Sequence, residues 1–258
     1  MSSCLVSNPE VEVRHLSKWY RVNGHVVQAL ADVSLAAEPG EFVSVVGPSG
    51  SGKTTLFNLI CGLSRPDSGE LLLKGQPVQG RRGLVAYMPQ KDVLLPWRTV
   101  LGNVLLGAEV DGRPTEEARR EALELMPAFG LEGFEHRYPH ELSGGMRQRA
   151  ALLRTYLFHR DVLLLDEPFG ALDALTRRQL QLWLLSVWEE RRKTILFVTH
   201  DVAEAVFLSD RIYVLTARPA QVREVVAVDL PRPRTAEMVA HPAFAAAEAH
   251  LLAALLPE

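Results

Sequence analysis

The stretch GPSGSGKTT, from Gly47 to Thr55, constrains the fold more than any other part of the chain. Gly47, Gly52, Lys53 and Thr54 match the spacing G-x-x-x-x-G-K-[ST], between the strand-like EFVSVV and the helical TTLFNLICGL. Glycines allow backbone N–H groups to curl around phosphate oxygens, and the start of the following helix adds its positive dipole end. A flexible turn is the alternative, but the flanking patterns disfavour it. We expect a nucleotide cradle in which Lys53 neutralises phosphate charge and Thr54 ligates Mg2+.

Composition and charge set the broad class of the chain. With 258 residues, 47% hydrophobic and 23% charged, it resembles one large globular domain or a domain with subdomains. The formal net charge of -3 provides no basic field for nucleic acid, so anion binding has to be local. The two cysteines, Cys4 and Cys61, have no thiol nearby at metal-ligand spacing. We expect no disulfide framework, no zinc site, no nucleic-acid partner and a reducing cytoplasm.

Neither a secretory leader nor a membrane span is expected. MSSCLVSNPE lacks a basic start followed by a long apolar run, and no stretch approaches the roughly 18 uninterrupted apolar residues of a spanning helix. The apolar segment 243–256 is interrupted by Glu248 and His250. This pattern favours an amphipathic helix that packs on its own domain over a helix at a membrane surface.

A second segment, DVLLLDEP, supplies acidic groups. An apolar strand from Asp161 delivers Asp166 and Glu167 to its carboxyl end, which is the edge where parallel sheets bind ligands. We expect Asp166 to hold Mg2+, directly or through water, and Glu167 to polarise the water that attacks the γ-phosphate. A strand that ends in a solvated acidic turn is the alternative, which the phosphate-binding loop disfavours.

The order of strand and helix patterns predicts the fold class. Apolar or β-branched runs predict strands at 11–16, 41–47, 70–75, 84–89, 161–168, 194–200 and 211–217. Helical patterns between the later runs imply a parallel sheet, whereas NGH and KGQ join the early runs as hairpins. Strand signals stop from about 99 to 157, where TEEARREALELMPAFG has helical spacing with Thr115 as its expected cap. We expect an α/β fold: a P-loop NTPase (RecA-like) core with an antiparallel β subdomain and an inserted α-helical subdomain.

A third segment, LSGGMRQR at 142–149, resembles the signature of the ATP-binding-cassette (ABC) family of ATPases. In that family the serine and glycines, here Ser143, Gly144 and Gly145, close on the γ-phosphate of an ATP held by a partner subunit. The start of a helix with glycine N–H groups is an anion site, and the chain already has one in its P-loop, which suggests a dimer. A plain N-cap at Ser143 is the alternative.

The resemblance runs from about 11 to 226 and implies roles for further residues. Tyr20 lies where the family stacks an aromatic ring on adenine; neighbouring Trp19 is an equivalent candidate, and core packing is the alternative for both. Gln90 matches the glutamine that senses Mg2+ and the attacking water. His200 matches the switch histidine that bonds the γ-phosphate and positions the water. Asp173 matches the aspartate that contacts the partner across the dimer, with an N-cap as its alternative.

The resemblance therefore implies an active ATPase that uses ATP and Mg2+. The expected catalytic residues are Glu167, His200, Gln90 and Lys53. The expected nucleotide-binding residues are Tyr20, Gly47, Pro48, Ser49, Gly50, Ser51, Gly52, Lys53, Thr54, Thr55, Ser143, Gly144, Gly145 and Asp173. The expected Mg2+ ligands are Thr54, Gln90 and Asp166. The resemblance also implies a single ABC ATPase domain over 1–258, made of a β subdomain and P-loop core (1–91), a helical subdomain with the signature (92–158), the rest of the core (159–226) and a short tail (227–258).

Members of the family dock on a separate membrane permease through a groove. The residues that line this groove directly follow the family's glutamine, which is Gln90 here. In this chain they read KDVLLPWRTVLGNV, and the candidate docking residues are Leu94, Leu95, Pro96 and Trp97. Packing inside the helical subdomain is the alternative for this segment.

The sequence of this segment is similar to sequences of the importer branch for nitrate, alkanesulfonates, taurine and pyrimidine precursors. The segments DEPFGALDALTR and THDVAEAVFLSDRIYVL share this similarity. A homodimer is the default expectation, because both halves of each composite site are intact in this chain, and the similarity implies a position bound peripherally on the cytoplasmic face of the inner membrane. Its partners would be permease subunits and, indirectly, an extracytoplasmic solute-binding protein, which choose the solute. A soluble cassette ATPase that acts as an assembly scaffold, as in iron-sulfur cluster biogenesis, is the alternative.

Overall fold

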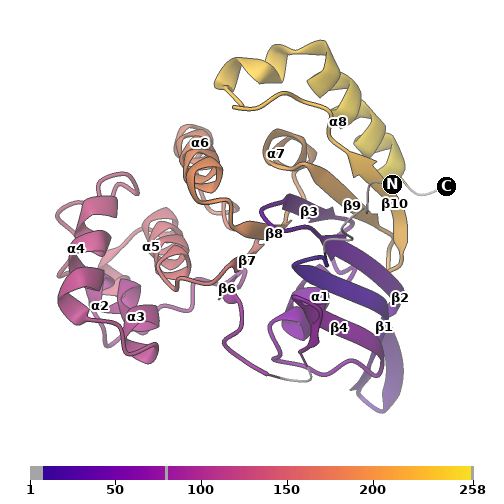
Figure 1. Ribbon diagram of the computed structural model, residues 1–258, viewed down its shortest axis with the longest axis horizontal. Coiled ribbons are helices and arrows are strands. Elements are labelled where there is room, and N and C mark those ends of the chain that lie inside the picture. The colour runs from indigo at the N-terminus through magenta and orange to yellow at the C-terminus, as the bar shows by residue number, and fades with distance from the viewer. Residues whose placement is uncertain (1–7, 79–80, 257–258) are drawn as a thin grey trace, which may run out of the picture.

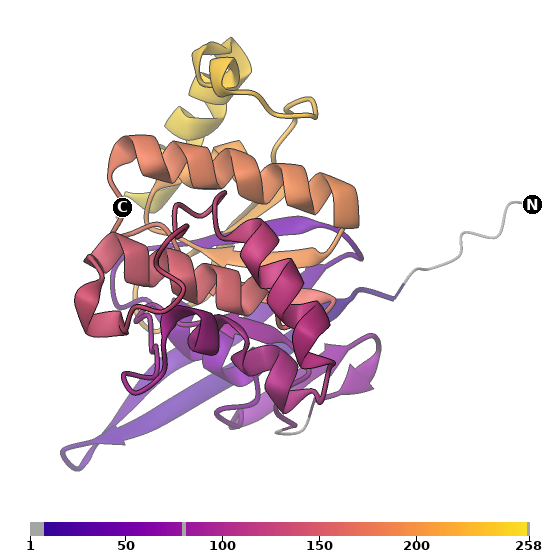
Figure 2. The ribbon, with the colours of Figure 1, turned by 90° about the vertical axis from the view of Figure 1, so that its left-hand side faces the viewer.

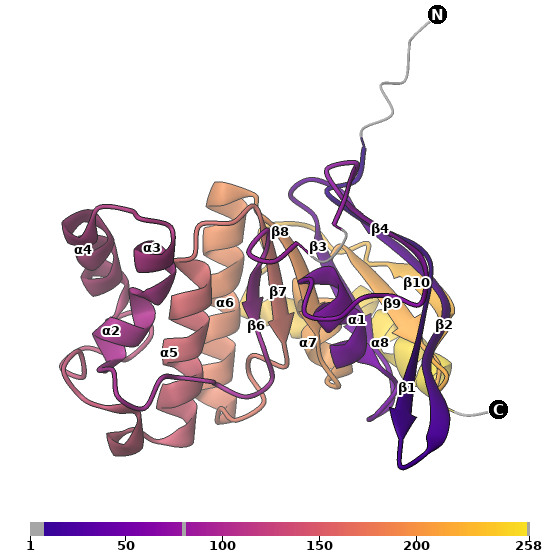
Figure 3. The same cartoon turned by 90° about the horizontal axis from the view of Figure 1, so that it is seen from below.

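The computed structural model describes residues 8–78 and 81–256. Two β-sheets, a helix between them and a group of helices on the far face of the larger sheet make up the molecule (Figures 1 and 3). The fold is the expected α/β P-loop NTPase core with an antiparallel β part and an inserted helical part. Cys61 is free and buried, whereas Cys4 and positions 1–7, 79, 80, 257 and 258 of the expected ranges lie outside the described residues.

The larger sheet has the strand order β10-β9-β3-β8-β7-β6. Its strands are β3 (Phe42–Val46), β6 (Ala86–Met88), β7 (Val162–Asp166), β8 (Thr194–Val198), β9 (Arg211–Leu215) and β10 (Val222–Ala227). Neighbouring strands pair in parallel from β9 to β6, and β10 is antiparallel to β9. Every residue of β3, β7 and β8 is buried, because both faces of a parallel sheet are covered.

The smaller sheet is antiparallel, with the order β2-β1-β4-β5. Its strands are β1 (Val11–Val22), β2 (His25–Ala37), β4 (Ser68–Leu73) and β5 (Gln76–Pro77). Both predicted hairpins are present: Asn23 and Gly24 join β1 to β2, with φ values of 50° and 81° that suit a two-residue turn. Helix α1 (Lys53–Ile60) packs between the two sheets, where its Leu56 and Phe57 belong to their shared core (Figure 3).

Helices fill the interval between β6 and β7. They are α2 (Val100–Val104), α3 (Leu106–Val110), α4 (Thr115–Leu125), the short η1 (Pro139–Glu141) and α5 (Gly144–Tyr156), and they lie at one end of the molecule (Figure 1). Helices α6 (Ala174–Arg191) and α7 (Val202–Leu208) follow β7 and β8. Helix α6 is the long orange helix in Figure 2. One core joins these helices to the sheet: Phe42 of β3 lies 6.0 Å from Trp188 of α6, ring centre to ring centre.

The C-terminal segment adds η2 (Ala236–Ala240) and helix α8 (Pro242–Leu255). As expected, α8 packs on its own domain, with Phe244 and Leu251 buried next to α7 (Figure 1). In the described part of the chain, no helix combines the length and apolar character needed to cross a membrane. The expected cap at Thr115 is wrong, because Pro114 occupies the N-cap of α4 and Thr115 is already helical.

Candidate active site

The predicted catalytic groups follow four strands that are neighbours in the larger sheet, in the order β3-β8-β7-β6. The P-loop follows β3, His200 follows β8, Asp166 and Glu167 end β7, and Gln90 follows β6. Because these strands are parallel, their carboxyl ends meet at one edge of the sheet. The fold thus brings together residues that are up to 153 positions apart in the chain, from Gly47 to His200.

Two glycines of the P-loop are required by close contacts. A Cβ at Gly47 would lie 3.0 Å from the Leu215 carbonyl oxygen. A Cβ at Gly52 would lie 2.9 Å from a Leu30 methyl group, and the φ of Gly52 is 113°, which residues with a side chain rarely adopt. The loop therefore packs directly on β9 and β2.

Lys53 is folded back onto the P-loop. Its Nζ donates to the carbonyl oxygens of Gly47 at 2.7 Å and Pro48 at 2.9 Å, and lies 3.4 Å from Ser51 Oγ. Burial lowers the pKa of Lys53, and the nearby carboxylates of Glu167 and Asp166 act in the opposite direction. The ammonium is thus held over the loop where phosphate charge would be placed.

Thr54 and Asp166 form the second contact of the site. The Thr54 hydroxyl donates to Asp166 Oδ2 at 2.9 Å. Burial raises the pKa of Asp166, against the Thr54 bond that lowers it. A buried carboxylate beside a hydroxyl fits a Mg2+ ion, which usually takes one or two protein oxygens and completes its shell with phosphate and water. Residues 8–78 and 81–256 contain no cluster of three or more His, Cys, Asp or Glu side chains that could hold a metal ion.

Glu167 is the meeting point of three segments. Gln90 Nε2 donates to Glu167 Oε2 at 3.1 Å, and His200 Nδ1 lies 3.4 Å from the same oxygen. The Glu167 side chain is 20% exposed, whereas that of His200 is 61% exposed. The Glu167 carboxylate is therefore partly accessible to solvent.

The signature residues lie at the start of α5. Ser143 is its N-cap and accepts from the Met146 N–H at 3.2 Å, as the alternative interpretation expected. Asp173 likewise caps α6, accepting from the Thr176 N–H at 3.0 Å. Ser143, Gly144 and Asp173 are all exposed. Capping therefore leaves these groups available to a second molecule, and it does not exclude the binding roles.

The two candidate aromatic residues lie on β1 of the smaller sheet. Tyr20 is half-buried, with the Lys18 Nζ 5.4 Å from the centre of its ring. Trp19 is 38% exposed, and its backbone N–H donates to Asp67 Oδ2 at 2.7 Å. Neither ring belongs to the buried cores, so the alternative of core packing is not supported for either.

Gln148 is a site residue that motif reasoning missed. It is buried on α5, where its Nε2 donates to the Glu167 carbonyl at 2.9 Å and its Oε1 accepts from the Ala171 N–H at 3.0 Å. The signature helix is therefore bonded directly to the loop that carries Glu167. The signal in the sequence is a polar residue on the buried face of α5, four positions before the buried Leu152.

Arg218 was also missed, because its partner is 168 positions away. It lies in the loop after β9, and its Nη2 donates to the Gly50 carbonyl of the P-loop at 2.9 Å. Backbone bonds between Ala220 and residues 29 and 31 attach this loop to β2. An arginine therefore supports the middle of the P-loop from outside the motif.

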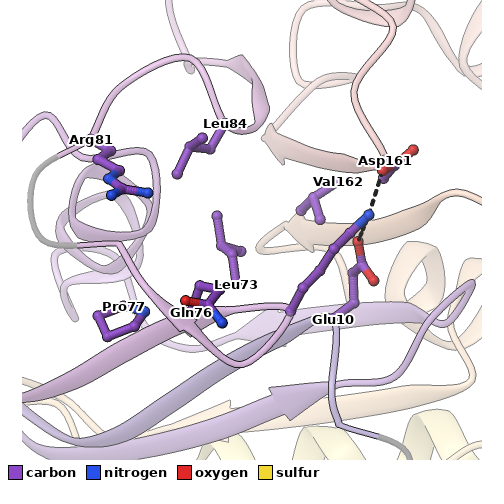
Figure 4. Close-up of a pocket in the computed structure, with 9 residues that line it drawn as sticks. Glu10, Leu73, Gln76, Pro77, Arg81, Leu84, Asp161 and Val162 are labelled. Carbon is purple, nitrogen blue, oxygen red and sulfur yellow. Dashed lines mark hydrogen bonds and ion pairs between the residues drawn. The ribbon is translucent and has the colours of Figure 1, made fainter.

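A hollow of about 280 Å³ lies at the opposite edge of the sheet (Figure 4). Lys74 crosses it, with its Nζ 2.6 Å from Asp161 and 3.3 Å from Glu10. Asp161 precedes the first residue of β7, so this hollow is at the end of the strand away from Asp166. None of the predicted site residues lines it, and we assign it no part in the chemistry.

Comparisons with known proteins identify the family of the chain. The family model described as ABC transporter matches residues 30–170. An uncharacterized ABC transporter ATP-binding protein of Methanocaldococcus jannaschii is 48% identical over 225 residues, which cover 87% of this chain and 84% of that protein. The aliphatic sulfonates import ATP-binding protein SsuB of Bacillus cereus is 40% identical over 225 residues, which cover 87% of this chain and 88% of that protein.

Solved structures give the same result. A dimeric bacterial ABC transporter cassette superposes with a TM-score of 0.79 at 32% identity, over 86% of this chain and 100% of that chain. A dimeric cassette in a post-hydrolysis state, bound to ADP and Pi, has a TM-score of 0.78 at 32% identity, over 86% and 100% of the two chains. Fold and site together define a nucleotide-binding P-loop ATPase. The chain belongs to the ABC transporter family, as its ATP-binding ATPase subunit.

Proposed function

We propose that this ATPase powers an importer that takes up a small solute of the nitrate, sulfonate, taurine or pyrimidine-precursor type through a separate permease. The observation that carries the ATPase mechanism is the carboxylate of Glu167, shared by Gln90 and His200 beside the P-loop. The importer role is supported by the similarity to a protein named for aliphatic sulfonate import.

In the proposed reaction, water attacks the γ-phosphorus of ATP, and the bond from this phosphorus to the bridging oxygen of ADP breaks. Glu167 accepts the proton of the attacking water through Oε2, and Gln90 and His200 fix the orientation of that carboxylate. The Lys53 ammonium and the backbone N–H groups of the P-loop stabilise the phosphate charge. A Mg2+ ion held by Thr54 and Asp166, with Gln90 close by, would neutralise charge on the β- and γ-phosphates. Tyr20 would stack on the adenine ring.

The second half of each site would come from a second copy of the chain. Ser143, Gly144 and Gly145 at the start of α5, and Asp173 at the start of α6, are the groups we assign to the partner's nucleotide and to the dimer contact. The placement of Ser143, Gly144 and Gly145 at the N-terminus of α5 supports the nucleotide contact, because such a position favours anions, and the exposure of Asp173 supports the dimer contact. The dimeric cassettes among the structural neighbours support the same assembly.

We assign permease docking to the outer surface of the helical part. Asn103 is fully buried and holds the preceding loop, with its Oδ1 accepting from the Leu95 N–H at 2.6 Å and its Nδ2 donating to the carbonyls of residues 95, 98 and 99. The rigid loop leaves Trp97 72% exposed, which suits an interface anchor, whereas Leu94 is 8% exposed and packs in the core. Leu94 therefore fits the packing alternative better than docking.

A nearby apolar hollow of about 190 Å³ supports the same surface. It lies between β6, α3 and the end of α5 and is lined by Tyr87, Leu106, Gly107, Val110, Arg154, Thr155 and Phe158. Exposed Val110 and Trp97 would flank an incoming permease helix. The enzyme would then lie on the cytoplasmic face of the membrane, and the permease with its extracytoplasmic solute-binding protein would choose the solute.

The test is to tag the chain in its native cell, extract membranes with mild detergent and identify what co-purifies. We expect a multi-helix membrane protein, and its loss when Trp97→Ala is tagged instead. The exposed Leu252→Ala on α8 is the matched control and should retain the permease. Recovery only from the soluble fraction, with cluster-assembly proteins attached, would contradict the importer and favour a scaffold ATPase.

A further inference from the structure

Arg177 joins two loops of the active site that no sequence motif connects. It lies on α6, and the three nitrogens of its guanidinium face three different acceptors. One Nη donates to Asp201 Oδ2 at 3.4 Å, and the other donates to the Leu172 carbonyl at 3.2 Å. The Nε lies 3.7 Å from Glu204 Oε1.

These acceptors belong to functionally distinct loops. Leu172 directly precedes Asp173, the exposed residue at the start of α6. Asp201 directly follows His200 and caps α7, where its Oδ1 accepts from the Glu204 N–H at 3.1 Å. A single guanidinium thus holds both the loop that ends at Asp173 and the loop that carries His200 to Glu167.

Glu204 provides a second connection between the same elements. Its carboxylate is buried and accepts from the Thr199 hydroxyl at 2.7 Å and from Gln181 of α6 at 3.2 Å. The Thr199 hydroxyl in turn accepts from the Asp201 N–H at 3.0 Å. Both neighbours of His200 are therefore bonded into one buried network, and such a network favours a single arrangement of its members.

We propose that Arg177 is a positioning residue for ATP hydrolysis that makes the alignment of His200 depend on the loop at Asp173. This inference rests on the proposed function, in which Asp173 contacts the partner subunit and His200 bonds the γ-phosphate. When a partner displaces the loop, the guanidinium follows the Leu172 carbonyl and the Asp201 carboxylate follows the guanidinium. His200 then meets Glu167 in the productive geometry once the second subunit is in place.

A purely structural role, in which Arg177 braces α6 against α7, is the competing explanation. A substitution of Arg178, the next residue, distinguishes the positioning role from the purely structural role. Its guanidinium lies 4.0 Å from the ring centre of Phe207 on α7, and it donates to Gln181 on its own helix at 3.4 Å. It packs the same two helices together but bonds neither the Leu172 carbonyl nor the Asp201 carboxylate. Arg178→Met is therefore the matched control.

The experiment measures steady-state ATP hydrolysis with Mg2+ for Arg177→Met, Arg178→Met and the wild type. We expect Arg177→Met to lower kcat by about tenfold and to change KM for ATP by less than about twofold, because the P-loop is not altered. Arg178→Met should keep a kcat near that of the wild type. The two variants should shift the unfolding midpoint by similar amounts.

Asp201→Asn tests the connection itself, since Asn preserves the N-cap of α7 but removes the charge that Arg177 meets. We expect it to lower kcat as Arg177→Met does, and the double variant to be no slower than either single variant, as for residues that act as one unit. A double variant whose loss of kcat equals the product of the two single losses would overturn the proposal. A kcat for Arg177→Met that equals that of Arg178→Met would also overturn it.

Failure of the proposed function would have a different signature. A wild-type protein that does not hydrolyse ATP, or a Glu167→Gln variant that does not dimerise with MgATP, would contradict that function. Without a dimer, no partner subunit could act on His200 through the loop at Asp173. With both properties present, Arg177→Met in the Glu167→Gln background should still dimerise, because the defect follows assembly. Loss of dimerisation in this double variant would place Arg177 in the interface and overturn its role as a positioning residue.

Discussion

At the scale of the residue, Glu167 has a backbone conformation that residues with a side chain seldom adopt. Its φ is 49°, a left-handed value that typically costs about 1–3 kcal/mol and persists where surrounding contacts impose it. Here the Glu167 N–H donates to the Val198 carbonyl on β8 at 2.9 Å, and Gln148 donates to the Glu167 carbonyl at 2.9 Å. These two bonds hold the turn that directs the carboxylate between Gln90 and His200.

Glu167→Gln should abolish most hydrolysis. The amide keeps the size of the side chain but cannot accept the proton of water, so kcat should fall by about 10²- to 10⁴-fold while MgATP still binds. Phosphate release and nucleotide binding measure the two properties. The control is Glu190→Gln on the exposed face of α6, which should leave both unchanged. Turnover of Glu167→Gln near the wild-type rate would remove Glu167 from the role of base.

Lys193 should make stability depend on pH. Burial, and secondarily the neighbouring Arg191, lower its pKa from 10.5 to about 8. In the described residues its Nζ has no hydrogen-bond partner, and it lies 5.2 Å from the Tyr156 ring centre. Because the folded state disfavours the charged amine, stability from this group is present above its unfolded pKa and is lost as pH falls through about 8.

Lys193→Met should therefore stabilise the fold by about 2 kcal/mol below pH 8, after allowance for partial solvent screening, since it keeps the stem and removes the charge. The gain should shrink as pH rises from about 8 towards 10.5. Urea unfolding across this range measures it, and the exposed Lys91→Met provides the baseline. A gain that does not change with pH would contradict the account.

At the scale of the element, helix α7 is held at both ends by groups from elsewhere. Asp201 caps its start, and Arg234 from the C-terminal segment donates to the carbonyls of Val206, Phe207 and Ser209 at its end. Arg234 is 5% exposed, and burial lowers its pKa to about 10. A cation at the carboxyl end of a helix also meets the negative end of the dipole. The tail thus stabilises the helix that follows His200.

Arg234→Ala should destabilise the fold by about 2–3 kcal/mol, because several buried carbonyls lose their donor while the cost of burying the charge is recovered. Urea unfolding measures the loss. The exposed Arg119→Ala on α4 should stay within about 0.5 kcal/mol of the wild type. An Arg234→Ala protein as stable as the Arg119→Ala protein would show that the tail does not support α7.

At the scale of the whole molecule, the sequence predicts those site residues that belong to a motif and also lie at the end of a predicted strand. Gln90 follows a predicted strand, Glu167 and His200 lie at the carboxyl ends of two others, and parallel pairing places such positions at one edge. Gln148 and Arg218 could not be predicted this way, because their partners lie 19 and 168 positions away and depend on tertiary packing. Strand β10 was missed because its sequence, VREVVA, has neither a strict apolar–polar alternation nor a continuous apolar run, although in the structure its residues alternate between half-buried and exposed at the sheet edge.

The N-terminal end of α4 shows another limit of sequence reasoning. Thr115 with Glu116 and Glu117 after it resembles a capped start, yet Thr115 is already the first helical residue and Pro114 occupies the N-cap position. The ψ of Pro114 is 120°, so this residue lies outside the helix, and its side chain makes no capping hydrogen bond. Propensity correctly predicts the helix and its acidic first turn, whereas its boundary depends on the chain that leads into it.

The central claim is that two copies of this chain enclose ATP between the P-loop of one and the signature of the other. Light scattering on purified Glu167→Gln tests it most directly, because this variant should bind MgATP without consuming it. The account predicts that the molar mass doubles on addition of MgATP, and that Ser143→Arg in the same background prevents the doubling. A protein that remains monomeric at saturating MgATP, or a Ser143→Arg variant that dimerises as well as its parent, would contradict it.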